Sequence, residues 1–254
     1  MKNILLFLLF LIPFSFNSYA TIEIDITEGN REPLPIAITN FFHDGNEKIT
    51  NTDLPSKIRG VIQNDLESTG LFNSIDEKAF IQENKSLHLK PRFADWRLIN
   101  SQGLVTGDLK IEDDRLKVEF RLWDTLAEKE IEGLVLITTP DNWRRISHMI
   151  ADKIYERLTG EEGYFDTRIV YVAEEGPKNN RVKKLAIMDQ DGANHKFLTS
   201  GKELVLTPRF NPVRQEITYL SYFKNLPRVY LLNIQTGIQE VVGDFPGMTF
   251  APRF

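Results

Sequence analysis

The residues that could do chemistry are few, and their spacing assembles no recognised reactive site. The chain has no cysteine and four histidines, which are His43, His88, His148 and His195. No two histidines stand four residues apart, so a helical HExxH zinc site is excluded. The missing thiol excludes cysteine nucleophiles, disulfides and cysteine-ligated metals. Residues 112–114, Glu-Asp-Asp, suit a tight hairpin turn better than a pair of acid–base catalysts.

Two further patterns match ligand or catalytic sites only in part. Residues 189–192, Asp-Gln-Asp-Gly, have the opening of a calcium-binding loop, but Ser200 stands at the twelfth position where that loop carries glutamate. A turn is the better interpretation. His148, within a long predicted helix, is interpreted as a packing or surface residue rather than a base. With no Gly-x-Ser-x-Gly elbow and no glycine-rich phosphate loop, we expect no catalytic residue, no metal ligand, no cofactor and no enzyme activity.

The composition and the N-terminal residues indicate the class of protein and its cellular compartment. The chain of 254 residues is 41% hydrophobic and carries a formal net charge of −5, which suits one or two domains and argues against nucleic-acid binding. A basic start, an apolar run over 4–12 and small residues at Ser18 and Ala20 form a Sec-type signal peptide pattern. The run is shorter than the roughly 20 residues of a spanning helix. We expect cleavage after Ala20, no membrane span afterwards and, in a Gram-negative cell, a periplasmic protein.

Residues 21–160 mix strand and helix patterns and predict an α+β N-terminal domain. Residues 21–27 alternate strictly between apolar and polar, as in a strand with one apolar face. The remaining patterns predict strands over 34–42, 104–111, 116–123 and 131–138, and helices over 55–69, 76–82, 93–100 and 140–158. The simplest architecture for these elements is a mixed sheet with helices packed on it.

Residues 161–254 have a different texture, with short strand-like runs separated by turn residues and an internal repeat. Strands are predicted over 168–173, 184–189, 196–199, 216–221, 228–233 and 240–242. Thr-Pro-Arg-Phe at 207–210 recurs as Ala-Pro-Arg-Phe at 251–254, and 185–189 recurs at 229–233 with the same spacing. A repeat of about 40–45 residues with four strands is typical of a propeller blade, although a β-sandwich with chance similarity is the alternative.

The second region is too short for a closed propeller. A propeller needs at least about four blades. Residues 161–254 supply only the first two blades, and these are incomplete, because the sequence reaches Phe254 inside a blade. We therefore expect the chain to be a fragment or a truncated product of a longer protein.

A signal peptide, a small α/β domain and repeats of this kind, in that order, resemble the TolB family of the Tol–Pal cell-envelope system. The matching segments lie at 58–72, 93–97, 120–124, 139–145, 155–160, 163–169, 188–194 and 245–250. The resemblance covers most of the mature chain. It implies domains at 1–20 (signal peptide), 21–160 (N-terminal α/β domain) and 161–254 (start of a six-bladed β-propeller, here truncated).

The same resemblance implies a binding protein rather than an enzyme. Its partners would be the lipoprotein Pal and the inner-membrane protein TolA, and its role would be outer-membrane integrity and constriction during cell division. The implied TolA-binding residues are Thr21, Ile22, Glu23, Ile24, Asp25 and Ile26. The implied Pal-binding residues are Leu206, Thr207, Met248, Thr249 and Ala251.

The residues themselves leave alternatives open. Residues 21–26 suit a strand that adds to a partner's sheet, but equally an edge strand of their own sheet, and a segment that detaches would combine both. Met248 suits an adaptable contact or ordinary blade packing. For the whole chain, the alternative function is the propeller part of a periplasmic hydrolase whose catalytic domain is absent from this chain.

Overall fold

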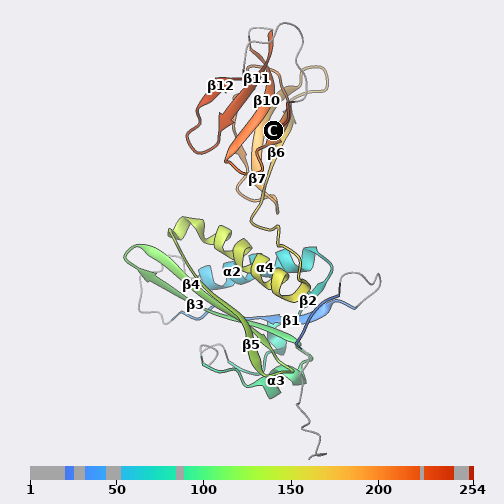
Figure 1. Cartoon of the computed structure of the whole chain (residues 1–254), viewed down its shortest axis with the longest axis vertical. Helices are drawn as coiled ribbons and strands as arrows, with labels where there is room; N and C mark the ends of the chain where they lie inside the picture. Colours follow the sequence, from blue (N-terminus) through green and yellow to red (C-terminus); the bar gives the residue numbers. More distant parts are fainter. Residues whose placement is uncertain (1–20, 26–31, 44–52, 84–88, 224–225, 243–251) are drawn as a thin grey trace, which may run out of the picture. The chain divides into compact units, whose positions relative to one another are not determined.

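The chain forms two compact units, within Met1–Glu162 and Gly163–Phe254. The structure, a computed structural model, describes residues 21–25, 32–43, 53–83, 89–223, 226–242 and 252–254, so the predicted signal peptide lies outside the described residues. The positions of the two units relative to one another are not determined, and each is described by itself (Figure 1). Within the described part, no helix combines the length and the apolar character that a membrane crossing requires.

The first unit is built on a mixed five-stranded sheet. Its strands are β1 (Leu34–Ile38), β2 (Phe72–Ser74), β3 (Gly103–Glu112), β4 (Arg115–Asp124) and β5 (Lys129–Thr138), in the order β2-β1-β3-β4-β5. β1 is parallel to β2 and β3, whereas β3, β4 and β5 are antiparallel neighbours. Glu112 pairs with Arg115 across Asp113 and Asp114, which have φ values of 50° and 57°. The acidic run is therefore a two-residue hairpin turn of the kind that needs positive φ, as predicted.

Helices cover both faces of this sheet. α2 (Leu54–Ser68) and α4 (Trp143–Thr159) lie side by side on one face, and α3 (Phe93–Leu98) lies on the other (Figure 1). Two 3-10 turns, Glu77–Ala79 and Pro140–Asn142, complete the unit. The apolar residues that recur every three or four positions are the buried ones, as in Ile146, Ile150 and Ile154 of α4. The predicted mixed sheet with packed helices is confirmed.

The first predicted strand is wrong for the residues that the structure describes. Residues 21–25 belong to no sheet, and residues 26 and 27 lie outside the described residues. Their inward N–H groups have partners on two different elements, the carboxylate of Asp124 and the carbonyl of Leu158, so no strand ladder forms. The strand predicted over 34–42 also ends early, at Ile38, and Phe42 makes only an isolated bridge to Asp108.

The second unit consists of two antiparallel sheets that share one core. The first sheet has the order β6 (Arg168–Glu175), β7 (Val182–Asp189) and β8 (Lys196–Phe197). The second has the order β12 (Gln239–Val241), β11 (Leu226–Asn233), β10 (Glu216–Phe223) and β9 (Val205–Phe210). Leu185 and Ile187 of the first sheet pack with Val205, Ile217 and Leu232 of the second. Two such sheets, unclosed among the described residues, are successive blades of a partial propeller, as predicted.

Strand β9 was not predicted from the sequence. It contains Pro208, which cannot donate to a ladder, and Thr-Pro is ordinarily a mark of a turn. The short β2 was also not predicted, because three residues carry too little alternation to be recognised.

Candidate protein-binding surfaces

The first candidate surface is the N-terminal segment, defined as Thr21–Asp25. The N–H of Ile22 donates to Asp124 Oδ2 at 2.9 Å, and the N–H of Ile24 donates to the carbonyl of Leu158 at 2.6 Å. Ile22 and Ile24 are half-buried, whereas Glu23 and Asp25 are exposed. The alternation seen in the sequence therefore survives as an inward apolar side and an outward acidic side, without a sheet.

The groups that hold this segment are the ends of other elements. Asp124, the last residue of β4, is buried, and its Oδ1 accepts hydrogen bonds from the N–H groups of Leu126 and Ala127. Leu158 lies in the last turn of α4, where carbonyls lack helical partners, and Gly160 ends that helix at φ 77°. Water can replace the peptide N–H at the Leu158 carbonyl, so that bond contributes about 0.5–1.5 kcal/mol, whereas the bond to the buried carboxylate of Asp124 contributes about 1.5–3 kcal/mol.

The N-terminal segment lies along an open groove at the end of α4. The groove has a volume of about 700 Å³ and is lined by Glu23, Ile24, Asp25, Glu132, Lys153, Glu156, Arg157, Thr159 and Gly160. Lys153 Nζ lies 2.6 Å from Glu156 Oε2, and this hydrogen bond raises the pKa of Lys153. Arg157 Nε donates to the carbonyl of Ile131 at 3.0 Å. The segment thus forms one wall of an open groove whose other lining residues, Glu132, Lys153, Glu156 and Arg157 among them, are mostly charged.

The second candidate surface is the bulge of β9 in the second unit. Leu206 pairs with Leu220 and Arg209 with Thr218, so Thr207 and Pro208 together face a single residue of β10. This is a β-bulge, and the missing N–H of Pro208 is tolerated there. Thr207 is exposed and has a φ of 46°. A β-branched residue in this left-handed conformation costs about 1–3 kcal/mol, a strain typical of functional positions.

The structure describes only part of the predicted binding residues. Thr21, Ile22, Glu23, Ile24 and Asp25 belong to the first unit. Leu206 and Thr207 belong to the second unit. Ile26, Met248, Thr249 and Ala251 lie outside the described residues, so the second copy of the Pro-Arg-Phe motif is described only from Pro252 onward.

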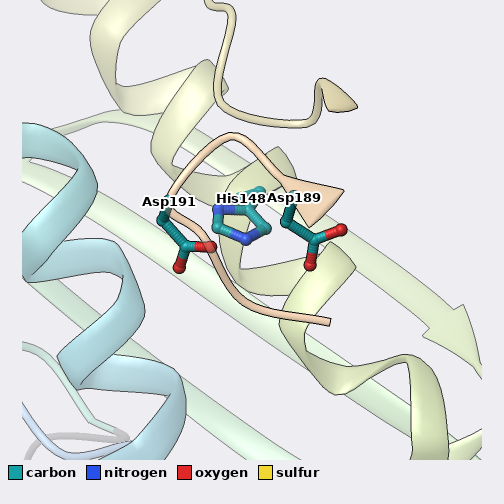
Figure 2. A group of neighbouring side chains, drawn as sticks. All are labelled: His148, Asp189 and Asp191. Atoms are coloured by element: carbon teal, nitrogen blue, oxygen red, sulfur yellow. The ribbon is translucent and has the colours of Figure 1, made fainter. Parts of the chain in front are cut away.

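A buried ionisable pair was missed by the sequence reasoning. His148 lies on α4 (Figure 2) and is buried, and its Nδ1 lies 2.6 Å from Oδ2 of Asp65 on α2. The side chains are 3% and 1% exposed. The interpretation of His148 as a packing residue holds, but its partner is 83 positions away and no local spacing indicates it. The available signal was Asp65 itself, a charge that shares the apolar face of α2 with Ile58 and Ile62.

The aspartates of the 189–192 run shape a turn. Asp189 ends β7 and Asp191 stands in the turn that follows (Figure 2). Asp191 Oδ1 accepts the N–H of Ala193 at 3.0 Å, and Asp189 Oδ2 accepts the amide of Asn194 at 2.6 Å. With Gly192 at φ 86°, these bonds are those of the turn that the sequence predicts.

Comparison with known proteins finds one family along both units. Residues 22–131 match the family model described as the TolB amino-terminal domain, and residues 155–254 match the model described as the TolB beta propeller domain. The chain is 60% identical over 252 residues to the Tol-Pal system protein TolB of Pelagibacter ubique, covering 97% of this chain and 56% of that protein. It is 56% identical over 234 residues to the protein of the same name from Paramagnetospirillum magneticum, covering 91% and 51%.

A solved structure of the same family is similar to this chain. The crystal structure of TolB from Acinetobacter baumannii superposes with a TM-score of 0.71 at 26% identity, covering 85% of this chain and 50% of that one. The chain spans about half the length of the curated relatives that it matches. The predicted family resemblance is confirmed: this chain belongs to the TolB family, whose amino-terminal domain and first propeller blades it contains.

Proposed function

We propose that this protein is a periplasmic component of the Tol–Pal cell-envelope system, which binds Pal and TolA, maintains outer-membrane integrity and supports constriction during cell division. Its high identity to relatives named Tol-Pal system protein TolB carries the proposal. The protein acts by binding rather than catalysis. A signal peptide over 1–20 directs it across the inner membrane, residues 21–160 form the domain that presents the TolA-binding segment, and residues 161–254 begin the Pal-binding propeller.

The TolA-binding element of this proposal is residues 21–26. Two features of the N-terminal segment support it. The backbone of the segment is held through the N–H groups of Ile22 and Ile24 and pairs with no strand, and alternate side chains face in and out as in a strand. Once released, the N–H groups of Ile22 and Ile24 become available to the edge of a partner's sheet, where backbone bonds give affinity and the two isoleucines fix the register.

Deletion of residues 21–26 from the mature chain is expected to abolish TolA binding. The two lost backbone hydrogen bonds, one of them to the buried carboxylate of Asp124, contribute about 2–4 kcal/mol, which is less than the stability of a typical domain, so the first unit is expected to stay folded. Isothermal titration calorimetry with purified TolA measures the first effect, and a circular-dichroism melt measures the second.

Two substitutions test whether the backbone carries the contact. Ile24→Pro removes one N–H together with the isoleucine side chain, whereas Ile24→Ala removes the side chain and keeps the N–H, so Ile24→Pro is expected to weaken TolA binding more than Ile24→Ala does. Retained TolA affinity in a deletion variant that melts normally would refute the assignment.

The Pal-binding element is proposed to include Leu206, Thr207, Met248, Thr249 and Ala251. The strained conformation of Thr207 supports this assignment, because a β-branched residue is held at positive φ on an exposed bulge where glycine would be easier to accommodate. A contact between the Thr207 side chain and a partner outside the chain would explain why this exposed residue is held in a strained conformation.

Thr207→Gly is expected to weaken Pal binding about tenfold without lowering stability. Relief of a strain of about 1–3 kcal/mol offsets the 0.5–1 kcal/mol or so that glycine costs in chain entropy. Surface plasmon resonance with immobilised Pal gives the affinity, and urea unfolding gives the stability. Asn194→Gly is the matched control, because Asn194 is also left-handed at φ 53° but lies on the turn between β7 and β8. Unchanged Pal affinity in Thr207→Gly would remove Thr207 from the interface.

A further inference from the structure

The second unit contains a hollow that the proposed function does not use. It has a volume of about 450 Å³ and lies over the β9–β12 sheet beside the turn that follows β8. Its lining residues, all within the described part of the chain, are Leu198, Thr199, Ser200, Glu203, Val205, Tyr219, Ser221, Phe223, Tyr230 and Gln239. Sites for small molecules have volumes of about 300–1,000 Å³, so this hollow can take a small ligand.

One wall of the hollow is aromatic. Tyr219 on β10 pairs directly with Tyr230 on β11, and their rings stack with centroids 5.7 Å apart and planes 26° apart. Phe223 lies four residues after Tyr219 on the same strand and therefore on the same face. Tyr219 is buried and its hydroxyl donates to Gln239 Oε1 at 3.1 Å, so this ring is fixed in place.

The formal charge carried by the lining of the hollow is negative. Glu203 is the only one of the ten lining residues that is formally charged at neutral pH. Burial, with contributions from Tyr230 and Glu203, raises the pKa of Tyr219 to about 12. The phenol of Tyr219 therefore stays neutral, and the hollow presents the rings of Tyr230 and Phe223 beside the buried Tyr219, several hydroxyl and amide groups, and a single half-exposed carboxylate.

We propose that this hollow binds a small organic cation, whose ammonium group lies against the half-buried ring of Tyr230, which is stacked on the buried Tyr219, and is neutralised by Glu203. Aromatic faces attract cations through their quadrupole, and the attraction grows when the site is partly shielded from water. A carboxylate nearby supplies the opposite charge, and the absence of any cation among the ten lining residues leaves nothing to repel an ammonium group. An anionic ligand would meet Glu203 without a counter-charge, so the lining selects against anions.

Choline and its uncharged isostere 3,3-dimethylbutan-1-ol separate a cation site from an apolar void. The two probes have nearly the same shape and differ in charge. Calorimetric titration of the folded chain is expected to give saturable choline binding with a dissociation constant near or below roughly 1 mM, and binding of the isostere about tenfold weaker. Choline is also expected to shift the ring proton resonances of Tyr219 and Tyr230 in NMR spectra.

Glu203→Gln is expected to weaken choline binding about tenfold and to leave binding of the isostere unchanged. Glu240→Gln is the matched control, because Glu240 is exposed on β12 and does not line the hollow. If Glu203→Gln should unfold the unit, the ring-proton shifts of the unmodified chain remain a test of the site. Equal binding of both probes, or no saturable choline binding, would overturn the proposal.

Discussion

Asp65→Ala is expected to lower the free energy of unfolding of the first unit by about 3–5 kcal/mol. Asp65 Oδ2 lies 2.6 Å from His148 Nδ1, and the two side chains are 1% and 3% exposed. Removing one partner of a buried, hydrogen-bonded pair leaves the other without its compensating bond in a poorly hydrated place. Because Asp65 belongs to α2 and His148 to α4, the loss falls on the contact between the two helices that cover one face of the sheet.

Guanidinium unfolding followed by circular dichroism measures this loss of unfolding free energy. The matched control is an exposed ion pair on α4. Lys153 and Glu156 are also 2.6 Å apart, but their side chains are 46% and 49% exposed. Glu156→Gln is therefore expected to cost less than about 1 kcal/mol. A double-mutant cycle with Asp65→Ala and His148→Ala isolates the coupling, which is expected to be strongly non-additive. Additive effects of the two substitutions would show that the pair does not act as a unit.

The parts of the fold that could be predicted are those in which burial follows a period in the sequence. Helix α4 buries every third to fourth residue, β4 buries alternate residues over 116–122, and β5 alternates half-buried and exposed residues over 133–138; their predicted positions agree closely with the observed ones. The N-terminal segment has the same kind of alternation, but its described residues pair with neither edge strand of the sheet, β2 or β5. Its partners, Asp124 and Leu158, are more than a hundred residues away, and no local pattern indicates them.

The candidate surfaces were assigned through the family resemblance, to which the residue patterns gave weak support of their own, and the physical reason for the second of them was visible only in the structure. The sequence shows that Thr-Pro-Arg-Phe repeats, but the left-handed Thr207 arises because two residues of β9 face one residue of β10. This strain comes from strand register, which is a tertiary property. The Asp65–His148 pair was missed for the same reason, because a helix face predicts burial without naming the partner across it.

Gly107→Ala is expected to destabilise the first unit by about 3 kcal/mol or more, because β3 has no space for a methyl group there. A Cβ at Gly107 would collide with the ring of Phe41 and lie 2.7 Å from the carbonyl oxygen of Glu119. Phe41 is 1% exposed, and its neighbour Phe42 is tied to this strand by hydrogen bonds to Gly107 and from Leu109, so neither ring nor backbone can easily move away.

Gly60→Ala on α2 is the matched control for this substitution and is expected to have the opposite sign. Nothing lies within 4 Å of a Cβ at Gly60, and alanine within a helix is more stable than glycine by about 0.5–1 kcal/mol. Urea unfolding of both variants separates steric conflict from the general cost of replacing glycine. Because the collision at Gly107 involves the Phe41 ring, Phe41→Leu is expected to cost less in the Gly107→Ala background than alone. Equal costs in both backgrounds would place the damage at the Glu119 carbonyl instead, and a Gly107→Ala variant as stable as the parent would contradict the packing of residues 39–42 against β3.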